Sequence, residues 1–263
     1  MNFEMNTATM PSLFIGHGSP MNLIEENQLS KTLNILGQQF NPKAILAVSA
    51  HWLDRGPVVQ NALEQKIIYD FYGFPEKLYQ IQYAARGWSE EMVHDLKGFC
   101  GSSLQVTNRR GLDHGVWAVL HHMYPKADVP VVQLSIPHKL SKNEYFELGR
   151  SLRGLRQKGI LILGSGNIVH NLKAINWKSD APADSWAIEF DEKVADLLVY
   201  KKFEQVLDLE KTSNALYLKA HPTDEHFIPL IYCMGAAFDS DSVTFPIEFI
   251  QNGSVSMRSV LFS

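Results

Sequence analysis

Residues 13–20, LFIGHGSP, join a short apolar run to an abrupt polar ending. A run of this length that is closed by glycines and a proline is typical of a buried strand, with His17 just beyond its end. The pattern recurs where AILAVSA leads into His51 and where ILILGSG leads toward His170. Because ligands of open α/β sheets bind outside the carboxyl ends of the strands, the three imidazoles are expected to meet. This arrangement predicts a metal site.

The rest of the chain alternates between strand and helix patterns. Ser141 and Glu144 form a capping box ahead of a helix with an apolar face. The pattern indicates one α/β domain over residues 1–263, a three-layer sandwich with a central mixed sheet and helices on both faces. Further strands are expected at 44–49, 103–106, 129–136, 160–163, 243–249 and 254–262, and a strand, a loop and a strand within 58–83. Helices are expected within 21–40 and at 89–99, 116–123, 184–200, 203–209 and 224–237.

Composition limits the function classes. The 263 residues are 45% hydrophobic, enough for one sizeable core, and the net charge of -4 offers no basic field for nucleic acid or an anionic membrane. The two cysteines, Cys100 and Cys233, have no zinc-cluster spacing and fit a reducing compartment. The chain shows no signal sequence or membrane-spanning run, so we expect a cytoplasmic protein without nucleic-acid or membrane partners. The oligomeric state stays open.

The ten histidines differ in what their positions indicate. Four of them suit a metal site: His17, His51 and His170 after apolar strands, and His226 at the expected start of the last long helix. His226 has acidic neighbours, Asp224 and Glu225, that could cap that helix or supply a carboxylate ligand. Neutral imidazole suits zinc, iron, copper or nickel, so ligand type alone does not choose the metal. His94 and His138 are typical of surface residues and His221 of a structural residue. Of His121 and His122, which are adjacent on one expected helix, at least one must point away from any site.

His114 is ambiguous, because it lies in the polar loop NRRGLDHG ahead of an apolar helix. It could serve the site or be structural. The preceding Asp113 could orient the His114 imidazole or cap the helix.

Six motifs in one order resemble a known family. LFIGHGSP, VSAHW, DFYGFP, LDHGVW, GSGNIVHN and HPTDEHF span residues 13–227 and are similar to those of class III extradiol ring-cleaving dioxygenases. Within that class they resemble the branch of plant and bacterial 4,5-DOPA dioxygenases. The resemblance implies a single-domain α/β fold related to the catalytic subunit of protocatechuate 4,5-dioxygenase.

The resemblance also implies residue roles. His17 and His51 match the first two metal-binding histidines of the family, and His226 matches the third ligand, which is a carboxylate in the wider class. His170 matches the histidine assigned there as acid/base, and in this branch it could approach the metal as a fourth ligand. The cofactor expected for activity is Fe(II). Zn(II) is expected as a bound or purified metal, although zinc has no redox chemistry.

The implied reaction is the insertion of O2 into a catechol, with DOPA as the suggested type of substrate, to give a muconic semialdehyde. The catechol would chelate the metal, and His170 or His114 would take a hydroxyl proton. Trp52, Tyr72 and Phe74 could form an aromatic wall for the ring, or belong to the core.

Two other classes stay open. A zinc hydrolase would use the same ligands to activate water, with Glu225 or His114 as base, but the chain has no HExxH or HxE…CxxC signature. A non-catalytic binding protein similar to the Memo proteins is the other alternative. The presence of His17, His51, His170 and His226 together argues against it, since a binding surface does not need them.

Overall fold

The structure is a computed structural model that describes residues 9–101, 103–178 and 181–263. Its main sheet has eight strands in the order β4-β3-β5-β2-β6-β1-β10-β7. The strands are β1 (Ser12–Gly16), β2 (Ala44–Asp54), β3 (Val58–Gln60), β4 (Gln105–Thr107), β5 (Val131–Pro137), β6 (Ile160–Gly166), β7 (Val243–Ile247) and β10 (Ser259–Phe262). A separate pair of short strands, β8 (Ile250–Gln251) and β9 (Val255–Ser256), lies between β7 and β10 in the sequence.

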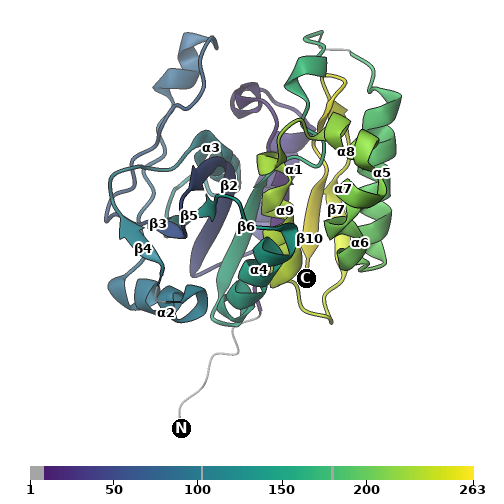
Figure 1. Cartoon of the computed structure of the whole chain (residues 1–263). Coiled ribbons are helices and arrows are strands. Elements are labelled where there is room, and N and C mark those ends of the chain that lie inside the picture. The colour runs from purple at the N-terminus through teal and green to yellow at the C-terminus, as the bar shows by residue number, and fades with distance from the viewer. Residues whose placement is uncertain (1–8, 102, 179–180) are drawn as a thin grey trace.

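The middle of the sheet is parallel. β5, β2, β6 and β1 pair in parallel, while β10 runs antiparallel to both β1 and β7. The carboxyl ends of the four parallel strands therefore lie at one edge, which is the upper edge in Figure 1. Because β1 and β6 pair from Ser12 with Ile162 to Gly16 with Gly166, both strands end at the same level.

Helices cover both faces of this sheet, as the sequence predicts, so the three-layer α/β arrangement with a mixed sheet is confirmed. One core packs β2 residues such as Ile45 against α1 (Gln28–Gln39) and α3 (His114–Met123). The other core packs the alternate β2 residues such as Leu46 against helices that include α2 (Glu90–Cys100), α4 (Lys142–Gln157), α5 (Ser185–Val199) and α9 (Ile228–Ala236). This two-residue alternation is the pleat of a strand that is buried on both faces.

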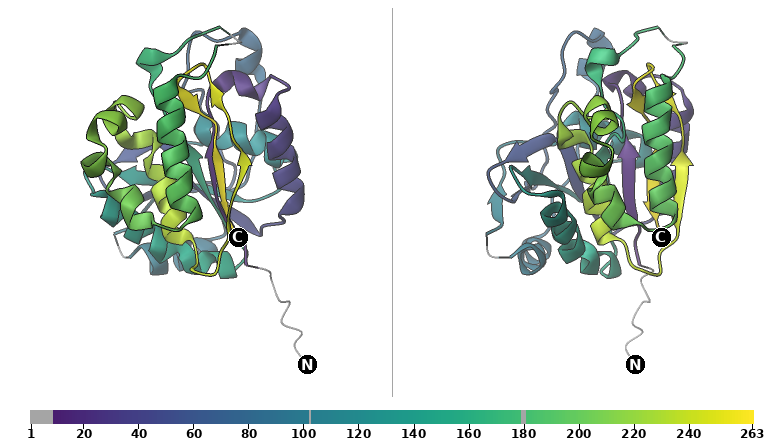
Figure 2. Two further views of the ribbon diagram at one scale, coloured as in Figure 1. Left: turned by 90° about the vertical axis from the view of Figure 1, so that its right-hand side faces the viewer. Right: turned by 45° about the vertical axis from the view of Figure 1, so that its right-hand side comes forward.

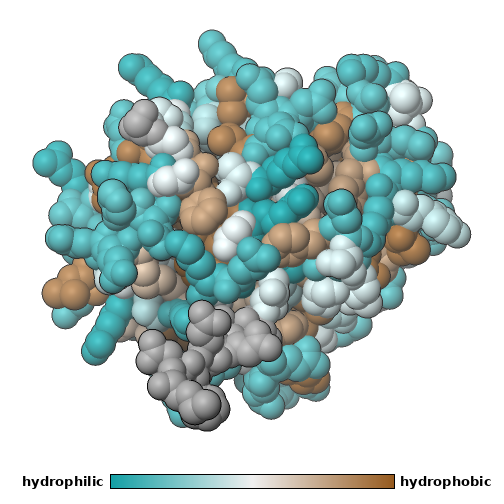
Figure 3. Space-filling view, turned by 90° about the horizontal axis from the view of Figure 1, so that it is seen from below, coloured by the Kyte–Doolittle hydropathy of each residue, from teal (hydrophilic) through white to brown (hydrophobic). Residues whose placement is uncertain are grey.

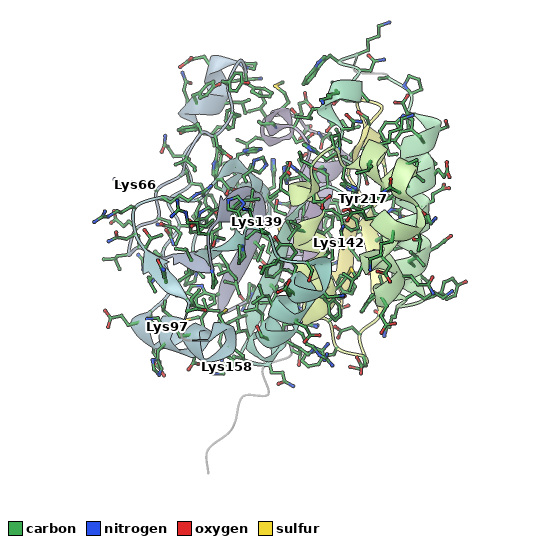
Figure 4. The ribbon with its side chains drawn as sticks, in the orientation of Figure 1. Lys66, Lys97, Lys139, Lys142, Lys158 and Tyr217 are labelled. Atoms are coloured by element: carbon green, nitrogen blue, oxygen red, sulfur yellow. The ribbon has the colours of Figure 1, made fainter. Side chains whose placement is uncertain are left out.

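The three short helices that follow α5 in the chain pack on α5 and on one another. α5 runs beside β7 (Figure 2), and three short helices follow it, α6 (Phe203–Leu207), α7 (Leu209–Thr212) and α8 (Asn214–Ala220). Lys142 of α4 pairs with Glu210 of α7, and its Nζ lies 4.5 Å from the centre of the Tyr217 ring of α8 (Figure 4). Across the described ranges of the chain, the helices are all too short or too polar to cross a membrane.

Several expected elements are wrong or incomplete. Within 58–83 only β3 forms a strand. The remainder is irregular around the short 3-10 helix η2 (Glu76–Gln80), because the rings of Tyr69, Phe71 and Tyr79 pack on one another instead of entering a ladder. The helix expected at 224–237 is divided into the 3-10 turn η4 (Asp224–His226) and α9, with Pro229 in the first turn of α9. The strand expected at 254–262 is divided into β9 and β10.

Candidate metal centre

The structure brings three histidines together at the carboxyl edge of the sheet. His17 follows β1, His51 lies near the end of β2 and His226 ends η4. One ring nitrogen from each lies within 4.8 Å of the other two, and Nε2 of His17 is 3.1 Å from Nε2 of His51. His17 and His226 are only 6% and 5% exposed. A buried cluster of imidazoles with this spacing could hold a metal ion.

The backbone around His17 is held in place by close packing. The His17 amide donates to the Gly166 carbonyl of β6 at 3.1 Å, and Asn22 donates to the His17 carbonyl at 3.2 Å. Gly18 has φ +61°, and a Cβ at this position would lie 2.6 Å from Sδ of Met257. The left-handed backbone therefore favours glycine after His17, and any side chain there would displace the end of the Met257 side chain.

The turn that carries His226 is anchored on both sides. Asp224 accepts a hydrogen bond from the Tyr217 hydroxyl at 3.0 Å and lies 3.7 Å from the Lys142 ammonium. The His226 carbonyl accepts from the Asn167 amide at 2.9 Å, and a Cβ on Gly166 would lie 2.1 Å from that carbonyl. Gly166 thus allows η4 to sit against the end of β6, which aligns His226 with His17.

Hydrogen bonds around the cluster assign the ring tautomers. The Ser165 hydroxyl donates to the Gly115 carbonyl, so at 2.9 Å it accepts a hydrogen bond from Nδ1–H of His17. Nδ1 of His51 lies 3.5 Å from an Asp70 carboxylate oxygen, and Nδ1 of His226 lies 3.3 Å from a Glu225 carboxylate oxygen. Carboxylates only accept, so Nδ1 of His226 carries the proton toward Glu225 and its Nε2 keeps a lone pair, and the nearby Asp70 carboxylate favours the same tautomer of His51.

The ring nitrogens of these three histidines are placed so that a cation could bind them. Burial, followed by the neighbouring His51, holds the pKa of His17 well below its ordinary value, and burial likewise lowers the pKa of His51 to about 4. Both rings are therefore neutral at neutral pH, and their Nε2 atoms lie within hydrogen-bond distance of each other, at 3.1 Å. Nε2 of His226 is buried and has no hydrogen-bond partner among the described residues. A divalent metal would satisfy all three nitrogens at once.

Two further histidines border the cluster. The His170 ring stacks on His226, with ring centres 3.4 Å apart and planes at 11°. Burial lowers the pKa of His170 to about 4, so this imidazole is also neutral at neutral pH. The His114 ring centre lies 4.2 Å from that of His51 and 5.5 Å from that of His17. The structure thus gathers all five histidines that the sequence considers for the site.

Asp70 joins His51 to His114 and is absent from the sequence prediction. Its Oδ1 accepts the His114 amide at 2.9 Å and lies 3.0 Å from Nδ1 of the same residue, while Oδ2 faces His51. Burial would raise the pKa of Asp70, but its contacts with His114 and His51 outweigh burial and lower that pKa to about 2. The sequence does contain one signal that could have identified Asp70, because this residue is the first of the DFYGFP motif.

Neither role expected for Asp113 is seen. It stands at the N-cap of α3 without a side-chain hydrogen bond to that helix. Its carboxylate is fully buried, accepts from Ser49 at 2.8 Å and from Gln133, and lies 3.2 Å from Arg110. Asp113 therefore ties α3 to β2 and β5, and Asp70 takes the place beside the His114 imidazole.

The histidine cluster opens into a cavity of about 710 Å³. Tyr72 and Phe74, two of the three aromatic residues expected near the substrate, line it. Trp52 is placed elsewhere: it is buried, and its ring packs beneath the Arg110 guanidinium at 4.7 Å. The cavity wall includes further residues that the sequence did not single out, Phe71, Leu172, Ile175, Trp177 and Val255. Separate segments contribute them, so no local motif marks them as a group.

Comparison with known proteins agrees with this geometry. Residues 11–260 match the family described as "Catalytic LigB subunit of aromatic ring-opening dioxygenase". The chain is 41% identical to a 4,5-DOPA dioxygenase extradiol of Escherichia coli K12, with 97% of this chain and 96% of the relative covered. It is 37% identical to a protein of the same name from Beta vulgaris, with 96% of each covered. A crystal structure of an uncharacterized Escherichia coli K12 protein matches with a TM-score of 0.83 and 36% identity, covering 97% of this chain and all of the other.

Proposed function

Because the chain belongs to the family of catalytic LigB subunits of aromatic ring-opening dioxygenases, we propose that it cleaves a catechol at the His17, His51 and His226 cluster. The enzyme class, an extradiol ring-opening dioxygenase, follows from the family and its relatives. The substrate of the proposal is a DOPA-like catechol, the second substrate is O2 and the product is a muconic semialdehyde. The whole of residues 1–263 is proposed to act as one catalytic domain.

One observation supports the proposal: His17, His51 and His226 each place a ring nitrogen within 4.8 Å of the other two, beside an aromatic-lined cavity. These three side chains would hold the metal, which we propose to be Fe(II) in the active enzyme. When bound, such an ion would supply Lewis acidity toward the catechol oxygens and one-electron chemistry toward O2. Zn(II) would fit the same ligands but has no redox chemistry.

The remaining groups would position the rings and move protons. His170 is neutral at neutral pH and can accept the proton of a catechol hydroxyl, then return it to the product as the ring opens. His114 is the second candidate for this step. A role for His170 as a fourth metal ligand is the alternative to its acid/base role. Asp70 and Ser165 would keep His51 and His17 in the tautomers that the metal needs.

Tyr72 and Phe74 are proposed to contact the substrate ring at the cavity wall. Trp52 would act only indirectly, through the Arg110 side chain that it packs against. Arg110 in turn donates to the His51 carbonyl at 2.8 Å, which links this pair to the backbone of the site. A cytoplasmic location stays a prediction from the sequence.

The test uses metal-stripped protein reloaded without oxygen with Fe(II) or with Zn(II). Air and a panel of catechols that includes L-DOPA are then added, while oxygen uptake and yellow semialdehyde are followed. We expect oxygen-dependent product with Fe(II) alone, lost in His17→Ala. Tight metal binding without turnover of any catechol would contradict the proposal and favour a metal-dependent hydrolase. Product formed without oxygen uptake would contradict it as well.

A further inference from the structure

We propose that Asp191 of α5 is a positioning residue: its carboxylate fixes the chain from residue 254 to residue 258 and, through that segment, the ring of His170. This inference rests on the proposed function, in which His170 moves a proton, and it adds a residue that acts from outside the cavity. Asp191 is only 5% exposed, lies in the middle of α5 and is not among the described residues that line the cavity.

The strand β9 pairs with the stretch of chain that carries His170. His170 and Val255 form an antiparallel bridge. The Ser256 amide donates a hydrogen bond to the Val169 carbonyl at 2.9 Å, and the Asn167 side chain donates to the Ser256 carbonyl at 2.8 Å. Because these contacts lie at His170 and directly before it, a shift of β9 would carry His170 with it.

Asp191 holds β9 from the side of α5, which runs along the C-terminal strands (Figure 2). Its Oδ1 accepts a hydrogen bond from the Ser256 hydroxyl. Its Oδ2 accepts from Nε of Arg258 at 2.8 Å and lies 2.7 Å from Nη2 of the same guanidinium. The Ser256 hydroxyl in turn accepts from the Arg258 amide at 3.2 Å. Both carboxylate oxygens are therefore used to hold the segment from Ser256 to Arg258.

Asp191 is the main buried constraint on this segment. Ser256 and Arg258 are buried as well, so the three side chains exchange their hydrogen bonds away from water. The other acidic partner of Arg258 is Glu248, whose side chain is 52% exposed. Hydrogen bonds to a charged group are stronger than neutral ones, and a low local dielectric strengthens them further. Loss of the Asp191 charge would therefore loosen the segment that supports His170.

The position of the His170 ring matters because its contacts are close. The ring stacks on His226 with centres 3.4 Å apart and planes at 11°. For a group that must reach a reacting atom, a misplacement of about 1 Å can lower the rate about 100-fold. Asp191 would therefore affect the reaction through the position of His170, from a distance at which it cannot take part in the chemistry.

The first test measures turnover in Asp191→Asn. The amide keeps the shape of the side chain, but one of the two positions that now accept from Ser256 and Arg258 becomes a donor. With L-DOPA and Fe(II)-loaded protein we expect kcat per folded molecule to fall about 10- to 100-fold. The affinity for Fe(II) should stay close to that of the wild type, because the three proposed ligands lie outside residues 254–258.

The matched control is Asp241→Asn. Asp241 is 7% exposed and pairs at 2.6 Å with Arg156, which also donates to the Met10 carbonyl just before β1. This variant should lose stability as Asp191→Asn does but keep the wild-type kcat. Ser256→Ala removes only the hydroxyl that Asp191 binds. It gives the same comparison if Asp191→Asn does not fold, and it should lower kcat to a smaller degree.

The second test does not depend on activity. In Zn(II)-loaded protein with isotopically labelled histidine, NMR follows the ring signal of His170, which is assigned by its absence in His170→Gln. The stacked His226 ring shifts this signal, so a displacement of His170 changes it. We expect a changed signal in Asp191→Asn and in Ser256→Ala, and the wild-type signal in Asp241→Asn.

Each other outcome is decisive. An unchanged His170 signal in both Asp191→Asn and Ser256→Ala would overturn the positioning role and leave Asp191 as a stabilising residue. An equal change of the signal or of kcat in Asp241→Asn would overturn it as well, because any buried ion pair would then have the same effect. A changed signal with the wild-type kcat would overturn the link to the reaction. If the signal changes as expected but the wild type opens no ring, the proposed function fails while the positioning of His170 by Asp191 stands.

Discussion

Two buried polar clusters lie at opposite ends of the sheet and differ in how their polar atoms are satisfied. At the amino end of β1, the Arg156 guanidinium pairs with Asp241 at 2.6 Å. It also donates to the carbonyls of Met10, Ala236 and Phe262. At the carboxyl end, Nε2 of His226 is buried beside His17 and His51 and has no hydrogen-bond partner among the described residues. A cluster with every group paired stabilises the fold, whereas one left without partners is suited to a ligand.

The surfaces over the two clusters also differ, in their polarity and in the access that they give to the cluster beneath. Seen from the end that holds Arg156, the molecule is mostly hydrophilic, with apolar groups scattered between polar ones (Figure 3). The histidine end opens instead into a cavity with exposed aromatic residues. Only the second end offers both an unsatisfied cluster and access to it. The comparison predicts that changes at one end should affect activity and changes at the other should affect stability.

The largest expected effect is the loss of activity in His17→Ala. We expect turnover to fall by more than the roughly 10- to 100-fold that follows loss of an outer partner of a metal ligand. Added metal should raise the melting temperature of the wild type but not of the variant, because the variant lacks a ligand. His94→Ala, at an exposed position, is the control and should behave as wild type. A His17→Ala protein that binds metal and turns over normally would remove the distinction between the two clusters.

Arg156→Met should have the opposite profile. Losing the guanidinium leaves Asp241 buried and unpaired, so we expect a loss of about 3–5 kcal/mol in the free energy of unfolding, measured in urea. Activity per folded molecule should be unchanged. Adding Asp241→Leu to this variant should recover part of the stability, since it removes the unpaired carboxylate. No recovery would show that the backbone hydrogen bonds of Arg156, and not the ion pair, carry its contribution.

Asp70→Asn should weaken the metal site without removing a ligand. An amide keeps the shape of Asp70 but supports the Nδ1–H tautomer of His51 less well, so we expect roughly a 10- to 100-fold loss of metal affinity. The readout is competition with a metal chelator, and the unfolding free energy of the metal-free protein is measured beside it. Asp208→Asn, at an exposed ion pair with Lys211, is the matched control. Unchanged metal affinity would leave Asp70 as a structural residue only.

The smallest effect concerns acid stability. His221 lies among the rings of Phe190, Tyr217 and Phe227, and burial lowers its pKa to about 3. The unfolded chain binds this proton near pH 6.5, so the stability from neutral His221 is present above that pH and is lost as the pH falls toward 3.

In His221→Phe the loss of stability of the metal-free protein between pH 7 and pH 4 should therefore be smaller than in the wild type. Urea midpoints at the two pH values measure it. The exposed His138→Gln should retain the wild-type loss. An equal loss in His221→Phe and wild type would mean that other groups account for the acid sensitivity.

Much of the fold is predictable from local patterns. The apolar runs before His17 and His51, the capping box at Ser141 and Glu144, and the cap at Ser89 each describe a few adjacent residues, and the structure contains the corresponding strands and helices. The prediction of a second strand in the stretch after β3 was wrong for a physical reason. Its β-branched and aromatic residues favour a strand, but three-dimensional packing of the rings of Tyr69, Phe71 and Tyr79 prevails over that preference.

The features of the site likewise separate into those set by adjacent residues and those set by tertiary contacts. By itself the sequence determined which histidines lie at strand ends, because the end of a strand is a local feature of the chain. Only the tertiary structure decided that Asp70 stands between His51 and His114 and that Trp177 shares a cavity with Tyr72. It also decided that Trp52 turns toward Arg110 instead of the cavity. Such contacts join residues far apart in the chain, and they exist only once the sheet has set the distances between its loops.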